Sequence, residues 1–142
     1  MVSSQSYTLL TDKYLQQILI TDKVKEAVAN SGVQKGIVSI ITMHTTTGIS
    51  VNEDLECLSS DIDNALNRLV PEELPYTHAR MLHSYGSTAG NPTGHIKSML
   101  VGNSCTFPVW DGSVILGGAQ DIFFYEFDGP SQRTFKVVVI GE

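Results

Sequence analysis

The sequence predicts one α+β domain, in which a mixed or antiparallel sheet packs against two main helices. The chain has 142 residues, a length that fits a single domain, and no linker or internal repeat divides residues 1–142. Most apolar segments have the length and composition of strands, whereas two have the three-to-four-residue period of helices. The hydrophobic fraction of 42% is typical of a globular protein with a buried core.

The first 32 residues predict two short strands and a helix. Residues 7–10 and 15–20 have the apolar composition of strands. Thr21 and Asp22 follow, and side chains of this kind are good N-cap acceptors at a helix start. Apolar residues then recur on one helical face as far as the Asn-Ser-Gly sequence at residues 30–32, which predicts the end of the helix.

The next segment predicts a buried strand and a second helix. Residues 36–43 form a nearly continuous, β-branched apolar run, which we interpret as a central strand buried on both faces. The polar residues 52–54 are expected to begin a helix. Apolar residues recur there at amphipathic spacing until Pro71 ends the helix.

The remainder predicts a long loop followed by strands. Residues 71–94 are rich in proline and glycine, and a loop of this length inside a compact domain tends to be functional. An Asp-Gly turn at residues 111–112 and an Asp-Gly-Pro turn at residues 128–130 indicate two hairpins. The four strands expected around these turns are residues 105–110, 113–116, 120–127 and 133–140.

Composition excludes several classes of function. The net charge of −6 argues against a nucleic-acid-binding protein, which would need a basic surface. No apolar run reaches the roughly 18 residues of a membrane span, and the first residues do not resemble a secretion signal. Cys57 and Cys105 are far apart and form no CxxC motif, which favours buried free thiols in a reducing compartment. We therefore expect a cytoplasmic protein with neither nucleic-acid nor membrane partners.

Four histidines are the candidates for a metal site. His44 follows the predicted central strand, His78 and His83 lie in the long loop, and His95 follows that loop. Imidazole is the commonest metal ligand, and a catalytic zinc ion typically takes three protein ligands and keeps one position open. The spacing contains no HxxxH or HExxH motif. From spacing alone, a surface or loop-anchoring histidine is the more frequent explanation for each residue.

Two polar segments near His44 have both a functional and a plain interpretation. Thr45 and Thr46 offer hydroxyl and backbone N–H groups just after a strand, where an anion can bind, although an ordinary polar strand end is the simpler explanation. Glu53 could act as the general base on a metal-bound water. Acidic residues also favour helix starts, and we weigh that role above catalysis.

Charged residues in the last third of the chain have the same two interpretations. Lys97 and Arg133 could neutralise a phosphate group, or could be solvated charges. Glu126 and Asp128 occupy alternate strand positions and therefore point to the same face. Such a carboxylate pair could orient a metal-bound histidine, or could lie at an exposed strand end.

Several short segments occur in the order and spacing of the YjbQ-like family. They are residues 44–49 (His-Thr-Thr-Thr-Gly-Ile), 52–53, 69–72, 75–78 (Pro-Tyr-Thr-His), 94–100 (Gly-His-Ile-Lys-Ser-Met-Leu), 111–112, 117–120, 126–130, 133 and 141–142. Each segment is short, but together they cover residues 7–142. The sequence therefore resembles this family, also known as the secondary thiamine-phosphate synthases.

The resemblance implies an α+β sandwich, a homotrimer, and a metal or anion site lined by histidines. Matched segment by segment, the implied metal ligands are His44, His78 and His95, with His83 as the alternative to His78. Many relatives carry Trp-Gln where this chain has Ala119-Gln120. A flat substrate ring would therefore lack that stacking partner here.

The family name implies the joining of a pyrimidine diphosphate to a thiazole phosphate with loss of pyrophosphate. We therefore expect a metal-binding enzyme that acts on a phosphorylated small molecule, with Glu53 and Lys97 as catalytic residues. Zinc is the expected divalent metal, and magnesium is the alternative. The expected substrate- or phosphate-binding residues are Thr45, Thr46, Lys97, Gln120 and Arg133. The competing hypothesis is a trimer that binds a metal or an anion without turnover.

Overall fold

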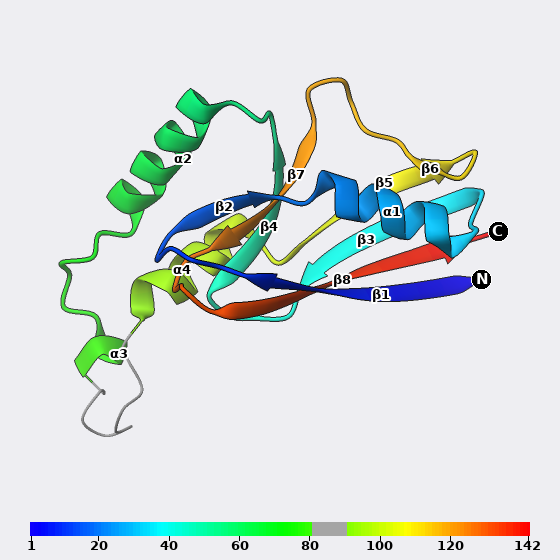
Figure 1. Cartoon of the computed structure of the whole chain (residues 1–142). Helices are drawn as coiled ribbons and strands as arrows, with labels where there is room; N and C mark the ends of the chain where they lie inside the picture. Colours follow the sequence, from blue (N-terminus) through cyan, green and yellow to red (C-terminus); the bar gives the residue numbers. More distant parts are fainter. Residues whose placement is uncertain (81–90) are drawn as a thin grey trace.

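The computed structural model describes residues 1–80 and 91–142, which form an α+β fold (Figure 1). Its elements, in chain order, are β1 (Val2–Leu10), β2 (Gln16–Leu19), α1 (Thr21–Ser31), β3 (Lys35–Thr42), β4 (Thr47–Asn52), α2 (Glu56–Leu69), α3 (Thr77–Arg80), α4 (Pro92–Val101), β5 (Ser104–Trp110), β6 (Ser113–Val114), β7 (Asp121–Glu126) and β8 (Gln132–Gly141). The predicted fold class is confirmed. Among the described helices, none is long and apolar enough to span a lipid bilayer.

The strands form two antiparallel sheets around one apolar core. The larger sheet has the order β1-β8-β3-β5-β6, and the smaller has the order β2-β7-β4. Val28 of α1, Val38 of β3, Phe124 of β7 and Val137 of β8 meet in this core and are almost fully buried. The hydrophobic effect at these contacts therefore holds α1 and the two sheets together.

The central strand β3 is buried on one face only. Burial alternates along it, with Val38, Ile40 and Thr42 buried and Ile37 47% exposed. The face that carries Ile37 also carries Trp110 of β5, because residues 37 and 108 are register partners in adjacent antiparallel strands. The prediction of burial on both faces was wrong, since a continuous apolar run does not show which face is covered.

Two predicted helix starts were wrong. Residues 47–52 form the strand β4, which pairs with β7, and α2 begins only at Glu56. Asn52 therefore caps no helix, and its Oδ1 accepts the backbone N–H of Glu53 at 2.9 Å. In α1 the N-cap position is Ile20, and Thr21 lies inside the helix with its hydroxyl bonded to Asp121.

The C-terminal prediction for α1 is confirmed. Gly32 follows the helix in the left-handed conformation, with a φ of 75°.

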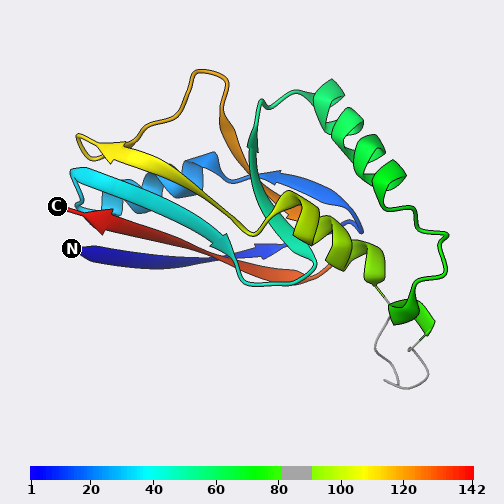
Figure 2. The same cartoon turned by 180° about the vertical axis from the view of Figure 1, so that it is seen from behind.

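A third substantial helix, α4, lies where the sequence predicted the end of a loop. Pro92 occupies the first helical turn, a position in which its missing N–H costs nothing. α4 packs beside β4, as seen from behind in Figure 2. A side chain at Gly94 would meet the Phe127 carbonyl oxygen at 2.9 Å, so this close approach requires glycine. α4 thereby carries His95 to the end of the smaller sheet.

The helix α2 stands apart from the sheets (Figure 1) and has no fully buried residue. Ile62 and Leu66 are its apolar contacts with a small aromatic cluster on and just beyond β7. Cys57, on the same helix, is exposed, so the prediction that it is buried was wrong. Cys105 is also a free thiol, and its burial raises its pKa to about 12.

Candidate functional site

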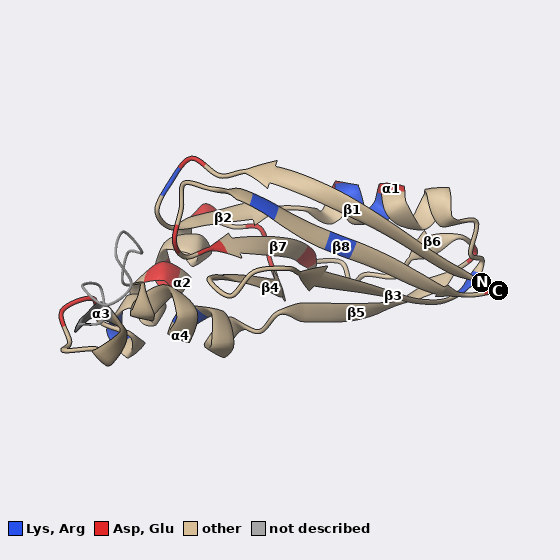
Figure 3. Cartoon of the chain, turned by 90° about the horizontal axis from the view of Figure 1, so that it is seen from below, with Lys and Arg blue, Asp and Glu red and all other residues tan. Residues whose placement is uncertain are grey.

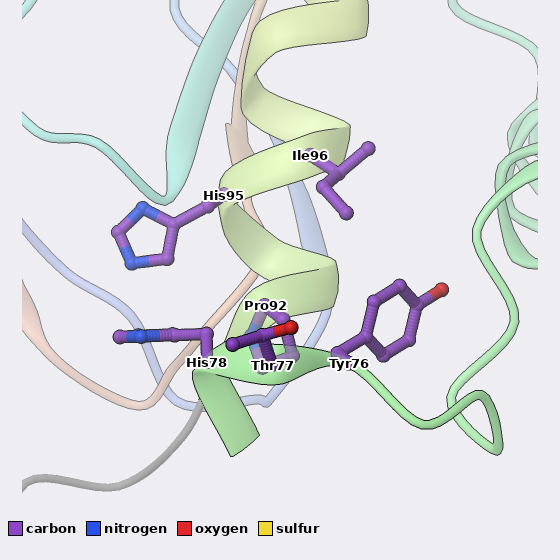
Figure 4. A pocket seen from close by; sticks show the side chains of 6 residues that line it. All are labelled: Tyr76, Thr77, His78, Pro92, His95 and Ile96. Carbon is purple, nitrogen blue, oxygen red and sulfur yellow. The ribbon is translucent and has the colours of Figure 1, made fainter. Parts of the chain in front are cut away.

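Two histidines from neighbouring helices lie together. His78 is in α3 and His95 is in the first half of α4, and their ring centroids are 5.3 Å apart in an edge-to-face arrangement. Figure 4 shows both rings extending to the same side, with Tyr76 on the other side of Pro92. The pocket around them has a volume of about 400 Å³ and is lined by Tyr76, Thr77, His78, Pro92, His95 and Ile96. We call it the His78 pocket.

His95 also lines a second pocket. It has a volume of about 450 Å³ and is lined by His44, Thr45, His95, Ser98, Met99, Gly102 and Asn103. We call it the His44 pocket. The segments that carry His44, His78 and His95 are far apart in the sequence, yet the fold places them around two pockets that share His95.

A chain of hydrogen bonds orients His78. The Nδ2 of Asn91 donates to the Oδ2 of Asp128 at 2.6 Å, and its Oδ1 lies 3.0 Å from the Nε2 of His78. Because the carboxylate can only accept, the amide oxygen faces His78 and accepts its Nε2–H. The neutral ring then keeps a lone pair on Nδ1. Asp128 therefore orients a histidine through Asn91, a residue that sequence reasoning missed.

His44 is held at the end of a strand ladder. Its Nε2 accepts the backbone N–H of Thr134, in β8, at 2.8 Å. Burial lowers the pKa of His44 below 6.5, the charge of Arg133 lowers it further, and Glu126 opposes both in part. Thr45 beside it is exposed and lines the His44 pocket.

Arg133 and Glu126 form a buried ion pair and line neither histidine pocket. The Nε and Nη2 of Arg133 donate to the two carboxylate oxygens of Glu126 at 2.8 and 2.7 Å. Thr11 also donates to this carboxylate, and Nη2 reaches the hydroxyl of Thr46 at 3.0 Å. Burial raises the pKa of Glu126, but these donors outweigh burial and the net shift is downward. The structure therefore commits Arg133, Thr46 and Glu126 to one another.

Lys97 points away from the histidines. It lies two residues after His95, which is about 200° around the helix axis. Its side chain is 1% exposed, and its Nζ donates to the Oδ1 of Asn67, in α2, at 2.6 Å. Burial lowers the pKa of this ammonium group, although Glu72 and Asp63 act in the opposite direction. Lys97 thus connects α4 to α2 and lines neither histidine pocket.

Glu53 and Gln120 lie at the far end of the smaller sheet. They line a separate pocket of about 360 Å³ with Val51, Asn52 and Ala119. Thr47 pairs with Glu126 and Asn52 pairs with Asp121, so the length of β4 lies between this pocket and His44. Six strand residues span about 17 Å. Within one chain, Glu53 therefore does not reach the histidines as a general base.

The described residues fit a metal ion in part. His78 and His95 form a pair of imidazoles, but no group of three His, Cys, Asp or Glu side chains in residues 1–80 and 91–142 is arranged to hold an ion. His83, the alternative ligand, lies outside the described residues. The joint binding of one ion by His44, His78 and His95 stays a prediction.

Sequence reasoning did not select two residues of this site. Tyr76 lines the His78 pocket, and Asn91 orients the His78 ring. Both lie in the long segment that was predicted to be functional as a whole. Their sequence neighbours, Pro75 and Pro92, indicated turns, and only the fold brings the two residues to the histidines.

Comparison with known proteins gives one family over almost the whole chain. The family described as UPF0047 protein YjbQ-like matches residues 5–142. A UPF0047 protein of Methanocaldococcus jannaschii is 40% identical and covers 96% of this chain and 93% of its own. An uncharacterised YjbQ/UPF0047 protein from Clostridium acetobutylicum has a solved structure with a TM-score of 0.86 at 36% identity, covering 96% of this chain and 99% of that one.

A second solved structure supports the same assignment. It is described as a YbjQ-like protein of unknown function from Sulfolobus solfataricus, has a TM-score of 0.90 at 29% identity, and covers 100% of this chain and 99% of that one. The fold, the spacing of the motifs and the relatives agree, and the chain belongs to the YjbQ-like UPF0047 family.

Proposed function

We propose that this protein is a metal-binding enzyme that acts on a phosphorylated small molecule at the two histidine pockets. One observation carries the proposal: His44, His78 and His95 come from three distant segments and line two pockets that share His95. A pocket into which a few polar side chains converge is the usual form of a small-molecule binding site.

His78 and His95 are the residues that would hold the metal ion. The bond from Asn91 fixes the His78 ring and leaves its Nδ1 lone pair available. Partners of this kind orient metal-binding histidines in known sites. Imidazole favours zinc over magnesium, which prefers oxygen ligands and bound waters. A bound zinc ion would act as a Lewis acid toward a phosphoryl or carbonyl oxygen.

The two pockets would bind different parts of the substrate. Tyr76, Pro92 and Ile96 give the His78 pocket apolar walls that suit the body of a small organic molecule. The His44 pocket is lined by side chains that can hydrogen-bond to a phosphate group. No lysine or arginine lines either pocket among the described residues, which disfavours a diphosphate substrate. We therefore favour a reaction of a monophosphate over thiamine-phosphate synthesis, which uses a diphosphate substrate.

The competing function is a trimer that binds a metal or an anion without turnover. In its favour, no carboxylate lines either pocket in the described part of the chain, so a general base of that kind is not at hand. Turnover would decide between the two functions, because only the enzyme converts a substrate.

The first test is metal content followed by turnover. We expect elemental analysis of the purified protein to find zinc, and a screen of phosphorylated small molecules to find metal-dependent turnover that chelation removes. The pyrimidine diphosphate and thiazole phosphate pair belongs in that screen. Zinc without turnover on any compound would favour the binding protein. Absence of bound metal even after incubation with zinc would contradict the metal-binding enzyme and a metal-binding trimer, and would leave a trimer that binds an anion.

Glu53→Gln belongs in the same test. Because Glu53 lies at the far end of β4 and starts no helix, this variant should keep the turnover and the melting temperature of the parent protein. Loss of turnover with unchanged metal content would return the general base to Glu53, contributed by a neighbouring chain.

We also propose that the protein is a homotrimer with the histidine pockets near a subunit boundary. Met99 lines the His44 pocket and is 77% exposed, and Leu100 beside it is 53% exposed. Figure 3 shows that β1 and β5 carry no charged residue. The outer face of their sheet includes the half-exposed Ile37 and Trp110, together with Lys136 on β8 and Lys35, which lies over the Trp110 ring. Exposed apolar areas of this kind mark association surfaces.

Light scattering is the direct measurement of this assembly. We expect a mass of three chains of 15.5 kDa each at micromolar concentration. A stable single chain at that concentration would contradict the trimer.

A further inference from the structure

The position of His44 fixes which of its ring nitrogens carries a proton. Where β3 ends, the Thr134 carbonyl still accepts the N–H of Met43 at 3.2 Å, and the Thr134 N–H donates to the Nε2 of His44 at 2.8 Å. The imidazole thus takes the place of the next strand carbonyl in the ladder. A nitrogen that accepts a hydrogen bond must offer a lone pair, so the proton of the neutral ring is on Nδ1.

The Nδ1–H is accessible from the His44 pocket. Among the residues that the structure describes, no buried side-chain nitrogen or oxygen lacks a hydrogen-bond partner. Within residues 1–80 and 91–142, the hydrogen-bond partner of the His44 ring is the Thr134 N–H, which binds Nε2. Nδ1 is therefore not buried, and the residue lines the pocket. A ligand in this pocket meets a hydrogen-bond donor at His44.

The same geometry disfavours His44 as a metal ligand. Coordination through Nδ1 would require the loss of its proton while Nε2 still accepts from Thr134, which leaves the ring as an anion. Coordination through Nε2 would require the bond to Thr134 to break. Either route costs more free energy than coordination by a histidine whose other nitrogen donates a hydrogen bond. His78 is such a histidine, because its Nε2–H donates to Asn91.

The other lining groups complete a site for an oxyanion. Thr45 is exposed and carries a hydroxyl group, and the side-chain amide of Asn103 adds a further donor. In the part of the chain that the structure describes, no aspartate or glutamate lines this pocket to repel a negative charge. Neutral donors held by the fold bind an oxyanion without needing to reorganise.

We propose that the His44 pocket is a metal-independent oxyanion subsite, in which neutral His44 donates through Nδ1–H to a phosphate oxygen of the ligand. The identity of the ligand as a phosphorylated molecule rests on the proposed function, whereas the proton position and the metal independence rest on the Thr134 contact alone. His44 then acts beside the metal pair and not within it.

The proton position can be measured in the unmodified protein. In a histidine-labelled sample, ¹⁵N spectra of the imidazole rings distinguish the Nδ1–H form from the Nε2–H form. We expect His44 in the Nδ1–H form, and His78 in the opposite form because Asn91 accepts its Nε2–H. Disappearance of one set of signals in His44→Asn assigns the ring. Detection of His44 as the Nε2–H form would overturn the inference.

Binding of inorganic phosphate tests the subsite itself. Protein freed of metal by chelation should still bind phosphate, as followed by chemical-shift titration. Asn places its amide nitrogen near the position of Nδ1, whereas Gln places it near that of Nε2. We therefore expect His44→Asn to stay within about threefold of the parent affinity and His44→Gln to lose about tenfold or more, the typical effect of a hydrogen bond to a charged group. Ser113→Ala, in a separate pocket, is the control and should change nothing.

The outcomes separate this inference from the proposed function. Phosphate binding that appears only after zinc is added, or equal losses in His44→Asn and His44→Gln with unchanged melting temperatures, would overturn the subsite. If the metal-free protein binds phosphate but the zinc-loaded protein converts no compound in the screen, the subsite stands and the enzyme function is contradicted. If His44→Gln does not fold, the spectra of the unmodified protein still decide the proton position.

Discussion

Replacing Arg133 with methionine should lower the free energy of unfolding by about 3–5 kcal/mol, the typical cost of removing one partner of a buried ion pair. Glu126 is 0% exposed, and Arg133 supplies two of the hydrogen bonds to its carboxylate. The variant keeps a long apolar side chain but leaves a buried negative charge without its counter-ion. Urea unfolding at neutral pH measures the loss, with an unchanged slope showing that the unfolded state is unaffected.

The double variant Glu126→Gln with Arg133→Met is the matched control. Glutamine keeps the shape of Glu126 without its charge, so the pair should recover a large part of the lost stability. A loss below about 1 kcal/mol in Arg133→Met would contradict the structural role, since that is the range of an exposed ion pair.

Acid provides an independent check on the same pair. In the folded protein the pKa of Glu126 is lowered below 4.5. As the pH falls, the Glu126 carboxylate is therefore protonated at a higher pH in the unfolded chain than in the folded protein. Stability from this pair is therefore complete above pH 4.5 and is lost as the pH falls through the lowered value. Glu126→Gln should remove that part of the acid sensitivity.

The strands and α1 could be predicted from local pattern, but β4 and α4 could not. Residues 47–52 alternate apolar and polar side chains as a half-buried strand does, yet His44 and the threonines before them indicated a turn and Asn52 indicated a helix start. In α4, Pro92 and Gly94 have the composition of a loop. Pro92 is tolerated in the first turn and Gly94 is required by the contact with Phe127, and both reasons come from the tertiary structure.

The candidate site could likewise be predicted only in part from the sequence. The chemistry of imidazole makes His44, His78 and His95 candidates from sequence. The sequence does not show which charges are already paired, because the partners of Lys97 and Thr46 lie 30 and 87 residues away along the chain. Lys97 and Arg133 were therefore expected to hold phosphate, whereas the fold buries both against neutral or acidic partners.

His95→Ala should have the largest effect on function, because His95 alone among the described residues lines both histidine pockets. We expect this variant to lose zinc affinity by more than about 100-fold, beyond the loss that follows removal of an outer partner of a metal ligand. It should also weaken phosphate binding in the metal-free protein. Turnover, if the protein is an enzyme, should fall below detection.

The two other histidines should separate these effects. His78→Ala should lose zinc and keep phosphate binding in the metal-free protein, because His78 lines only the pocket that lacks His44. His44→Ala should lose phosphate binding and keep zinc, because its Nε2 is bound to Thr134 and its Nδ1 carries the proton. Calorimetric titration with zinc and chemical-shift titration with inorganic phosphate give the two affinities for each variant, and the melting temperature shows that each is folded. A folded His44→Ala that loses zinc as completely as His78→Ala would mean that all three histidines bind one ion, as the resemblance implied. A folded His95→Ala that keeps both affinities would mean that the two pockets share a wall and not a function.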